Sequence, residues 1–375
     1  MTASTDPCFL FAACNPGAEN ALKRELARGY PHLRFAFSRP GFLTFKWDDV
    51  EGPTALWRLR AVFARTHGWS LGLVPDLGDA TVAAVVNERL SALTQGGQAF
   101  HRLHVWQRAL VEQPDGVPTV VGEEVVTRAE TFRAALVEAG CLPPQAAINE
   151  VASAGERVCD LIRLDDDRWA LGWHSVDSFE QRWPGGVLPL KAPAGMVSRA
   201  YLKMREALTW SALPMVPGDR CVEIGSSPGG ACQALLEDGM RVTGVDPAPM
   251  HSQVLAHPRF TYIKKRGAEV KRREYAGFRW LFADANVAPR YTLDTVESIV
   301  QNQHTSIEGM VLTLKLMDWR LADHMAEYAF RVRSWGFQEV RCRQLACNHQ
   351  EVCLAAQRAK PEPMPQVVAA RSSEG

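Results

Sequence analysis

The sequence lacks the features that mark membrane and exported proteins. None of its apolar runs is long enough to span a bilayer. Residues 1–7 have neither the basic start nor the apolar core of a signal peptide. Nine cysteines, an odd number without regular spacing, fit free thiols in a reducing compartment better than a disulfide framework. We therefore expect a cytoplasmic protein.

An excess of charge is also missing. The 42 Lys and Arg residues balance 42 Asp and Glu residues, which gives a formal net charge of +0. Whole-molecule attraction therefore cannot bring a nucleic acid to this protein, and any nucleic-acid surface must be a local patch. A hydrophobic fraction of 46% and a charged fraction of 22% are those of a folded protein. Its 375 residues suit two or three domains.

The N-terminal half has the hydrophobic pattern of small α+β units. In the first unit we expect a strand, a helix, a hairpin, a helix and a strand at residues 8–14, 18–28, 34–46, 53–65 and 69–74. In the second we expect a strand, a helix and a strand pair at residues 103–106, 123–139, 157–164 and 168–174. Trp57, Trp69 and Trp106 lie in apolar-periodic segments, so we expect them in the core rather than in a base-stacking platform.

From residue 191 the pattern changes to strands that alternate with helices, which predicts a parallel, doubly wound α/β sheet. The expected strands cover residues 220–224, 240–245, 260–263, 280–283 and 310–316, followed by an antiparallel edge pair at 338–342 and 351–356. The predicted division is two α+β units at 1–95 and 96–182, a Pro/Gly-rich linker at 183–190, the α/β domain at 191–360 and a disordered tail at 361–375.

The clearest motif follows the first strand of the α/β domain. The strand Cys221–Ile224 runs into a loop with the sequence Gly225-Ser226-Ser227-Pro228-Gly229-Gly230. Glycines at a strand-to-helix turn let a ligand approach the backbone closely. The next strand ends in Asp246, whose carboxylate can accept hydrogen bonds from both ribose hydroxyls of an adenosine cofactor. The pair indicates a nucleoside-cofactor site.

Two other interpretations of the loop conflict with its chemistry. Dinucleotide binding requires G-x-G-x-x-G, but the middle position is Ser227, and Pro228 lacks the N–H that a phosphate-cradling loop would use. The segment also matches the hydrolase elbow G-x-S-x-G, which uses the N–H of the residue after the nucleophile for its oxyanion hole. That residue is again Pro228. A purely structural loop remains open.

The loop resembles the S/C-P-G-G loop of the FtsJ/RrmJ-type ribose 2′-O-methyltransferases. Further segments agree in order, at residues 198–203, 282–284, 313–316 and 350–352. Within that family the chain is most similar to the bacterial 23S ribosomal RNA cytidine 2′-O-methyltransferases of the M type, whose N-terminal half contains a THUMP RNA-binding module. Residues 190–199 resemble their domain junction and Asn15–Glu19 their start. The resemblance covers residues 191–358 firmly and the N-terminal half in the order of its elements. It implies S-adenosylmethionine as cofactor, RNA as partner, and a ferredoxin-like/THUMP N-terminal half before a Rossmann-like domain.

The resemblance also implies a catalytic tetrad of Lys203, Asp284, Lys315 and Glu351. In the family the lysine that matches Lys315 removes the proton from the attacking ribose hydroxyl. A nearby Lys203 would lower the pKa of Lys315, whereas Asp284 and Glu351 would raise it, and the sequence leaves the balance open. Independently of the family, Lys315 lies in the otherwise apolar central strand expected at 310–316, and a charge there is costly unless it is paired or faces a cleft.

The cofactor-binding residues that the resemblance implies are Ser198, Gly225, Ser227, Pro228, Gly229, Gly230, Asp246 and Asp284. Two positions depart from the family: Ala231 replaces an aromatic residue that often follows P-G-G, and Arg266 stands where an acid usually lies near the adenine. No metal is expected, because the cationic cofactor itself provides the electrophile. The spacing of Cys342, Cys347, His349 and Cys353 also matches no standard zinc site.

The features and the resemblance together predict a SAM-dependent RNA ribose 2′-O-methyltransferase with a monomer favoured, and the resemblance implies a cytidine of 23S ribosomal RNA as its target. The alternatives are the same chemistry on tRNA or another ribosomal nucleotide, and an RNA-binding protein of this fold without activity. The basic segment 259–279 fits either a solvated face or a patch that follows RNA phosphates.

Overall fold

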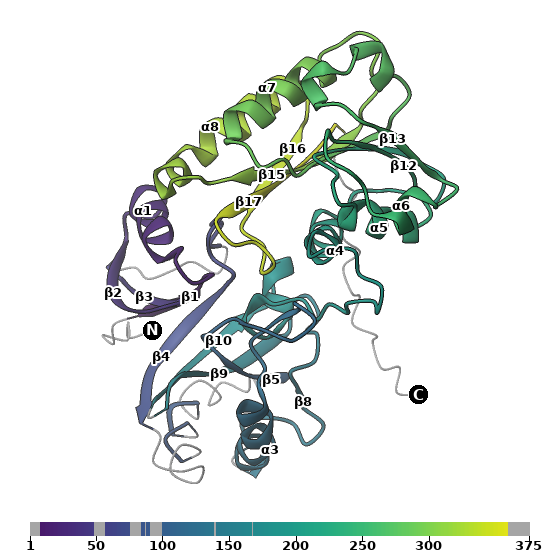
Figure 1. The fold of residues 1–375 in the computed structure, drawn as a ribbon. Coiled ribbons are helices and arrows are strands. Elements are labelled where there is room, and N and C mark those ends of the chain that lie inside the picture. The colour runs from purple at the N-terminus through teal and green to yellow at the C-terminus, as the bar shows by residue number, and fades with distance from the viewer. Residues whose placement is uncertain are drawn as a thin grey trace, which may run out of the picture.

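The computed structural model describes residues 8–48, 57–75, 84–86, 88–90, 100–138, 140–166 and 168–358. Two large sheets organise the chain, one in each half (Figure 1). The predicted tail at 361–375 lies outside the described residues. Within the described ranges, no helix is both long enough and apolar enough to cross a membrane.

The N-terminal half forms an eight-stranded mixed sheet with the order β2-β3-β1-β4-β10-β9-β5-β8. Its strands are β1 (Phe9–Ala13), β2 (Leu33–Arg39), β3 (Phe42–Trp47), β4 (Thr66–Pro75), β5 (Arg102–Gln107), β8 (Ala147–Ile148), β9 (Arg157–Asp165) and β10 (Arg168–Ser175). It also contains the helices α1 (Glu19–Gly29) and α3 (Glu123–Glu138), the 3-10 turns η1 (Phe179–Arg182) and η2 (Pro184–Gly186), and a hairpin of β6 (Val111–Glu112) and β7 (Pro118–Thr119). The strands expected here and the helices at 18–28 and 123–139 are confirmed.

One sheet runs through both predicted N-terminal units. β4 pairs with β1 on one side and with β10 on the other. The ring of Phe11 lies over Gly68 of β4 and Gly172 of β10, where an added Cβ would come within 2.7 Å and 2.6 Å of the ring. Glycine at these two positions therefore lets one aromatic side chain cover the seam between the units.

The helix expected at residues 53–65 is wrong over its described part, because residues 57–65 have no helical backbone. Their polar groups bond to other elements instead. The amides of Val62 and Phe63 donate to the Glu25 carboxylate at 2.7 and 3.2 Å, and the carbonyl of Val62 accepts from Gln344. Partners outside the segment have thus replaced the intrahelical hydrogen bonds.

The C-terminal half is a seven-stranded α/β domain with the order β13-β12-β11-β14-β15-β17-β16. Its strands are β11 (Arg220–Ile224), β12 (Arg241–Val245), β13 (Phe260–Ile263), β14 (Trp280–Ala283), β15 (Gly309–Lys315), β16 (Glu339–Arg343) and β17 (Glu351–Gln357). Its helices are α4 (Ala200–Ser211), α5 (Gly230–Glu237), α6 (Ser252–Leu255), α7 (Pro289–Val300) and α8 (Met325–Ser334), with 3-10 turns η3 (Gly267–Glu269), η4 (Arg272–Tyr275) and η5 (Trp319–His324). The first five strands are parallel, and β17 lies antiparallel between β15 and β16. The predicted doubly wound fold with its antiparallel strand pair is confirmed.

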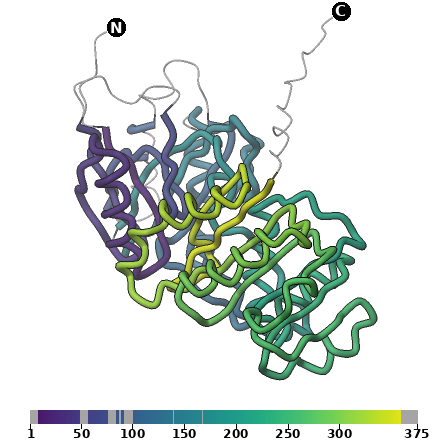
Figure 2. The backbone as a smooth tube through the Cα atoms, turned by 90° about the horizontal axis from the view of Figure 1, so that it is seen from above, coloured from purple at the N-terminus to yellow at the C-terminus, as the bar shows by residue number. Residues whose placement is uncertain are grey.

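The two halves share a hydrophobic core. Leu10, Leu22 and Leu26 of the N-terminal half belong to the same buried cluster as Leu316 and Val352 of the α/β domain. Figure 2 shows the last strands, in yellow, lying beside the purple and blue N-terminal segments. This packing brings the N-terminal half against the carboxyl end of β15 and the start of β17.

Candidate active site

Two glycines shape the loop after β11. Gly225 has φ +82°, and a Cβ there would lie 2.6 Å from the carbonyl oxygen of Asp284. Gly229 has φ +118° and precedes α5 directly. Only glycine adopts these backbone angles without strain while packed this closely. The loop therefore passes against the end of β14, which brings Asp284 beside the predicted cofactor loop.

Ser198 lies on the other side of the loop, just before α4. A Cβ on Gly230 would be 2.3 Å from the Ser198 hydroxyl oxygen, so glycine is required for this contact. The amide of Gln233 on α5 holds the segment before Ser198, because it accepts from Val197 N–H at 2.9 Å and donates to the Gly195 carbonyl at 3.2 Å. The Ser198 hydroxyl is shielded from solvent and has no hydrogen-bond partner among the described residues.

Asp246 follows β12 and faces the same loop. Its carboxylate accepts from the backbone N–H of Ser227 at 3.1 Å and of Ala248 at 2.8 Å. These two bonds leave further acceptor sites on a carboxylate, which has about four lone-pair positions. Asp246 therefore fixes the loop and retains acceptors for a ligand.

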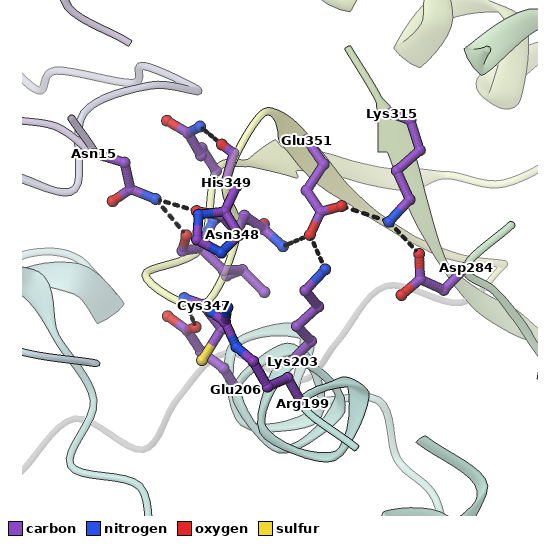
Figure 3. A network of polar contacts seen from close by, with 12 residues as sticks. Asn15, Arg199, Lys203, Glu206, Asp284, Lys315, Cys347, Asn348, His349 and Glu351 are labelled. Carbon is purple, nitrogen blue, oxygen red and sulfur yellow. Dashed lines mark hydrogen bonds and ion pairs between the residues drawn. The ribbon is translucent and has the colours of Figure 1, made fainter. Parts of the chain in front are cut away.

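The four residues of the predicted tetrad meet at the carboxyl edge of the sheet. Lys315 ends β15 and pairs in register with Glu351, the first residue of β17. The Lys315 ammonium lies 2.7 Å from Asp284 and also contacts Glu351. Lys203 of α4 contacts the second oxygen of Glu351. Figure 3 shows Glu351 between the two lysines, with Asp284 on the other side of Lys315.

The charges in this cluster shift the pKa values of Lys315 and Glu351. Burial lowers the pKa of Lys315, but Asp284 and Glu351 outweigh burial, so its pKa lies above the usual lysine range. Burial raises the pKa of Glu351, but Lys203 and Lys315 outweigh it and hold that pKa below its ordinary value. With no substrate bound, Lys315 is therefore an ammonium ion held by two carboxylates.

The comparisons with known proteins agree with this geometry. Residues 196–342 match the model of the FtsJ-like methyltransferase family. This part of the chain is similar to the FtsJ-like methyltransferases, and the chain is a SAM-dependent RNA methyltransferase. Its cofactor is S-adenosylmethionine, and the α/β domain is its methyltransferase domain.

Curated relatives extend the likeness beyond that domain. "Ribosomal RNA large subunit methyltransferase M" of Pseudomonas paraeruginosa is 26% identical over 309 residues, which are 77% of this chain and 80% of the relative. The protein of the same name from Xanthomonas axonopodis pv. citri is 27% identical over 375 residues, 93% of this chain and 99% of the relative. Among solved structures, TrmN from Thermus thermophilus aligns over 93% of this chain and 99% of its own at 13% identity, with a TM-score of 0.33 that is too low to support a conclusion.

The residues present fit S-adenosylmethionine. The buried Ser198 hydroxyl without a partner offers a hydrogen bond beside Gly230, and Asp246 offers acceptors at the adenosine end of the loop. Ala231 is buried against α4 in the core cluster. Arg266 is exposed, and its backbone N–H donates to Glu269 in the first turn of η3. The carboxylate that the structure brings next to Arg266 is therefore that of Glu269.

Sequence reasoning assigned no role to three buried polar residues at or near this site. Glu223 lines a cavity with Lys203 and Asp284. Burial raises the pKa of Glu223 to about 8, so it is largely protonated at neutral pH. Gln233 orients the segment before Ser198, and Glu206 on α4 accepts the backbone N–H groups of Ala346 and Cys347, both at 2.8 Å. Their signal in the sequence is a polar residue inside an otherwise apolar strand or helix face.

Proposed function

We propose that this methyltransferase transfers a methyl group from S-adenosylmethionine to the 2′-hydroxyl of a cytidine in 23S ribosomal RNA, acting as a cytoplasmic monomer. One observation carries the proposal. The two lysines and two carboxylates converge beside the glycine loop, at the edge of the sheet where open α/β domains bind ligands. The names of the curated relatives, which methylate ribosomal RNA of the large subunit, support the choice of substrate.

In this proposal Ser198, Gly225, Ser227, Pro228, Gly229, Gly230, Asp246 and Asp284 hold the cofactor. When bound, S-adenosylmethionine supplies an electrophilic methyl group on a positively charged sulfur. Asp246 accepts from the ribose hydroxyls of the adenosine, while Ser198 donates to the polar end of the methionine. Asp284 belongs to both sets, since it adjoins Gly225 through its backbone and Lys315 through its side chain.

Lys315 accepts the proton of the attacking 2′-hydroxyl. At rest it is an ammonium, so it first has to release a proton, and the rate of transfer rises with pH through the neutral range. Lys203 places a second positive charge at Glu351 and so weakens the electrostatic attraction between that carboxylate and the Lys315 ammonium. Asp284 and Glu351 both contact the Lys315 amine and so fix its orientation during the transfer.

We assign residues 1–182 to RNA binding, 183–190 to a linker and 191–360 to methyl transfer. The position of the β6–β7 hairpin supports this division. Its Glu112 forms an ion pair with Arg199 at the start of α4, and Val117 packs into the core cluster of the α/β domain. The N-terminal half therefore reaches the rim of the site, where it can hold an RNA strand that enters.

The test uses methyl-labelled S-adenosylmethionine and an unmodified 23S ribosomal RNA transcript. We expect label in 2′-O-methylcytidine after complete nuclease digestion and mass spectrometry. Label in another nucleotide, or in tRNA alone, would replace the proposed substrate. Titration calorimetry with S-adenosylmethionine and with NAD provides a separate check, in which only the former should bind.

The variant Lys315→Arg tests the base. Arginine keeps a cation between the two carboxylates but does not release its proton at assay pH. We expect the transfer rate to fall about a thousandfold, as for loss of a general base, while affinity for the cofactor stays within about threefold. If cofactor affinity fell as far as the rate, Lys315 would have a structural role and the proposed base would be wrong.

A further inference from the structure

Glu351 is held in place by a turn, residues 345–348, that immediately precedes β17. Asn348 closes this turn, because its side-chain oxygen accepts from Leu345 N–H at 2.9 Å. The side-chain nitrogen of the same residue donates to Glu351 at 3.3 Å. The turn is therefore hydrogen-bonded to the carboxylate that bridges Lys203 and Lys315.

The turn is fixed from two sides. From α4, Glu206 accepts two of its backbone N–H groups. From the N-terminal half, the side-chain nitrogen of Asn15 donates to the carbonyl oxygens of Leu345 and Asn348, each at 2.8 Å. Asn15 is 3% exposed and lies 330 residues from Leu345 along the chain (Figure 3). The side-chain NH₂ group of Asn15 faces both carbonyl oxygens. Flipping the amide would put its own oxygen against them and leave three acceptors without a donor.

We propose that Asn15 is a positioning residue for the transfer reaction, acting on Glu351 through the 345–348 turn and Asn348. This inference rests on the proposed function of Lys315 and Glu351 and adds the N-terminal half to the catalytic arrangement. A buried amide is well suited to the task, because its hydrogen bonds are strongly directional and leave polar backbone groups unpaired when lost. Loss of Asn15 lets the turn and Glu351 move away from Lys315.

Such movement has a specific electrostatic consequence. Asp284 and Glu351 together hold the pKa of Lys315 above its usual range. A displaced Glu351 leaves Asp284 as the nearer carboxylate, so the pKa of Lys315 falls. The native rate should therefore still be rising at pH 10, because the pKa of Lys315 lies above 10.5, whereas with Glu351 displaced the rate should level off below pH 10, at a lower value because the amine is less well aimed.

The experiment compares Asn15→Ala with Asn149→Ala in the full-length chain. Asn149 is a matched control, because its side chain also makes two backbone hydrogen bonds, to the N–H and the carbonyl of Val105 at 2.7 and 2.8 Å, and it lies in the same half away from the turn. We measure kcat and KM with the 23S transcript from pH 6.5 to 10, cofactor affinity by calorimetry, and the melting temperature.

For Asn15→Ala we expect kcat to fall about tenfold and its pH profile to move to lower pH, with cofactor affinity retained. Asn149→Ala should also lose thermal stability, because it loses two backbone hydrogen bonds and places alanine at a φ of +55°, but without a change in kcat or profile. Asn348→Ala should reproduce the pH profile of Asn15→Ala. The kcat of the double variant should be no lower than that of either single variant, because both substitutions break the same series of hydrogen bonds to Glu351. Asn348→Ala also serves if Asn15→Ala fails to fold.

An unchanged pH profile in Asn15→Ala and Asn348→Ala would overturn the inference while leaving the proposed function intact. The same holds if Asn149→Ala lowers kcat equally, since the effect would then reflect general loosening. No transfer by the native chain would instead overturn the proposed function, and this inference with it.

Discussion

Replacing Glu351 by glutamine removes the charge that joins the two lysines of the cluster. The Glu351 side chain is 6% exposed, and those of Lys203 and Lys315 are 20% and 16% exposed. Glutamine keeps the size and one acceptor, but its NH₂ group faces one of the ammonium ions. Removing one partner from a buried ion pair costs about 3 kcal/mol or more, because the remaining charge stays desolvated.

We therefore expect Glu351→Gln to lower the free energy of unfolding by about 3 kcal/mol at pH 7.5, or the melting temperature by about 4 °C in a chain of this size. Glu130→Gln is the control. Glu130 pairs with Arg133 on the surface, with 70% of its side chain exposed, and such pairs contribute about 1 kcal/mol or less.

The pH dependence gives the sharper test. The native pKa of Glu351 is depressed below its ordinary value of 4.5, so its carboxylate stabilises the fold fully above that pH. Its contribution is lost as the pH falls through the lower, native pKa. The difference in melting temperature between the native chain and Glu351→Gln should be constant from pH 8 to about 5 and narrow below. A difference that is absent at pH 7.5, or equally large at pH 3.5, would refute this reasoning.

Two further predictions concern the cofactor loop and the N-terminal sheet. Asp246→Ala should weaken S-adenosylmethionine binding about tenfold or more in calorimetry and leave RNA binding unchanged. The reason is that the loop loses the carboxylate that accepts from the N–H groups of Ser227 and Ala248. If the variant bound the cofactor as tightly as the native chain, Asp246 would not belong to the site. Burial lowers the pKa of His67 and of His104 to about 4, from an ordinary value of 6.5. Both are therefore neutral in the fold and protonate more readily when unfolded, so stability should fall from pH 6.5 towards 4 by up to about 3 kcal/mol for each. His104→Phe should flatten this dependence in thermal melts, and an unchanged slope would contradict it.

The α/β domain was predictable because its signals are local. Alternating apolar strands, glycines where the loop requires positive φ, and a lone lysine in an apolar strand each depend on neighbouring residues. They placed Gly225, Asp246 and Lys315 at the same edge of the sheet, where the parallel strands end. The expected antiparallel pair at 338–342 and 351–356 is present. The sequence did not show that its second strand, β17, inserts between β15 and β16.

What the sequence left open depends on contacts between distant residues. Whether Lys315 is charged depends on the distances to Asp284 and Glu351, which no spacing reveals. The segment at 57–65 has a helical apolar pattern, yet its amides bond to Glu25 and its carbonyl at Val62 bonds to Gln344. The joining of two N-terminal units into one sheet likewise follows from the pairing of β4 with β10. Tertiary partners decided each of these cases over local preference.

The contacts between the halves also explain why the catalytic edge has its present geometry. Arg343, at the end of β16, is 6% exposed, donates to the carbonyl of Arg65 at 2.6 Å and pairs with Glu180 at 3.3 Å. Both partners belong to the N-terminal half, as do Asn15 and Val62, which bond to the segment between β16 and β17. Several polar groups of that segment are thus satisfied from outside the methyltransferase domain, in addition to the two N–H groups that Glu206 of α4 accepts. Because Glu351 begins the strand that follows, the N-terminal half that we assign to RNA binding also holds in place the carboxylate next to the proposed base.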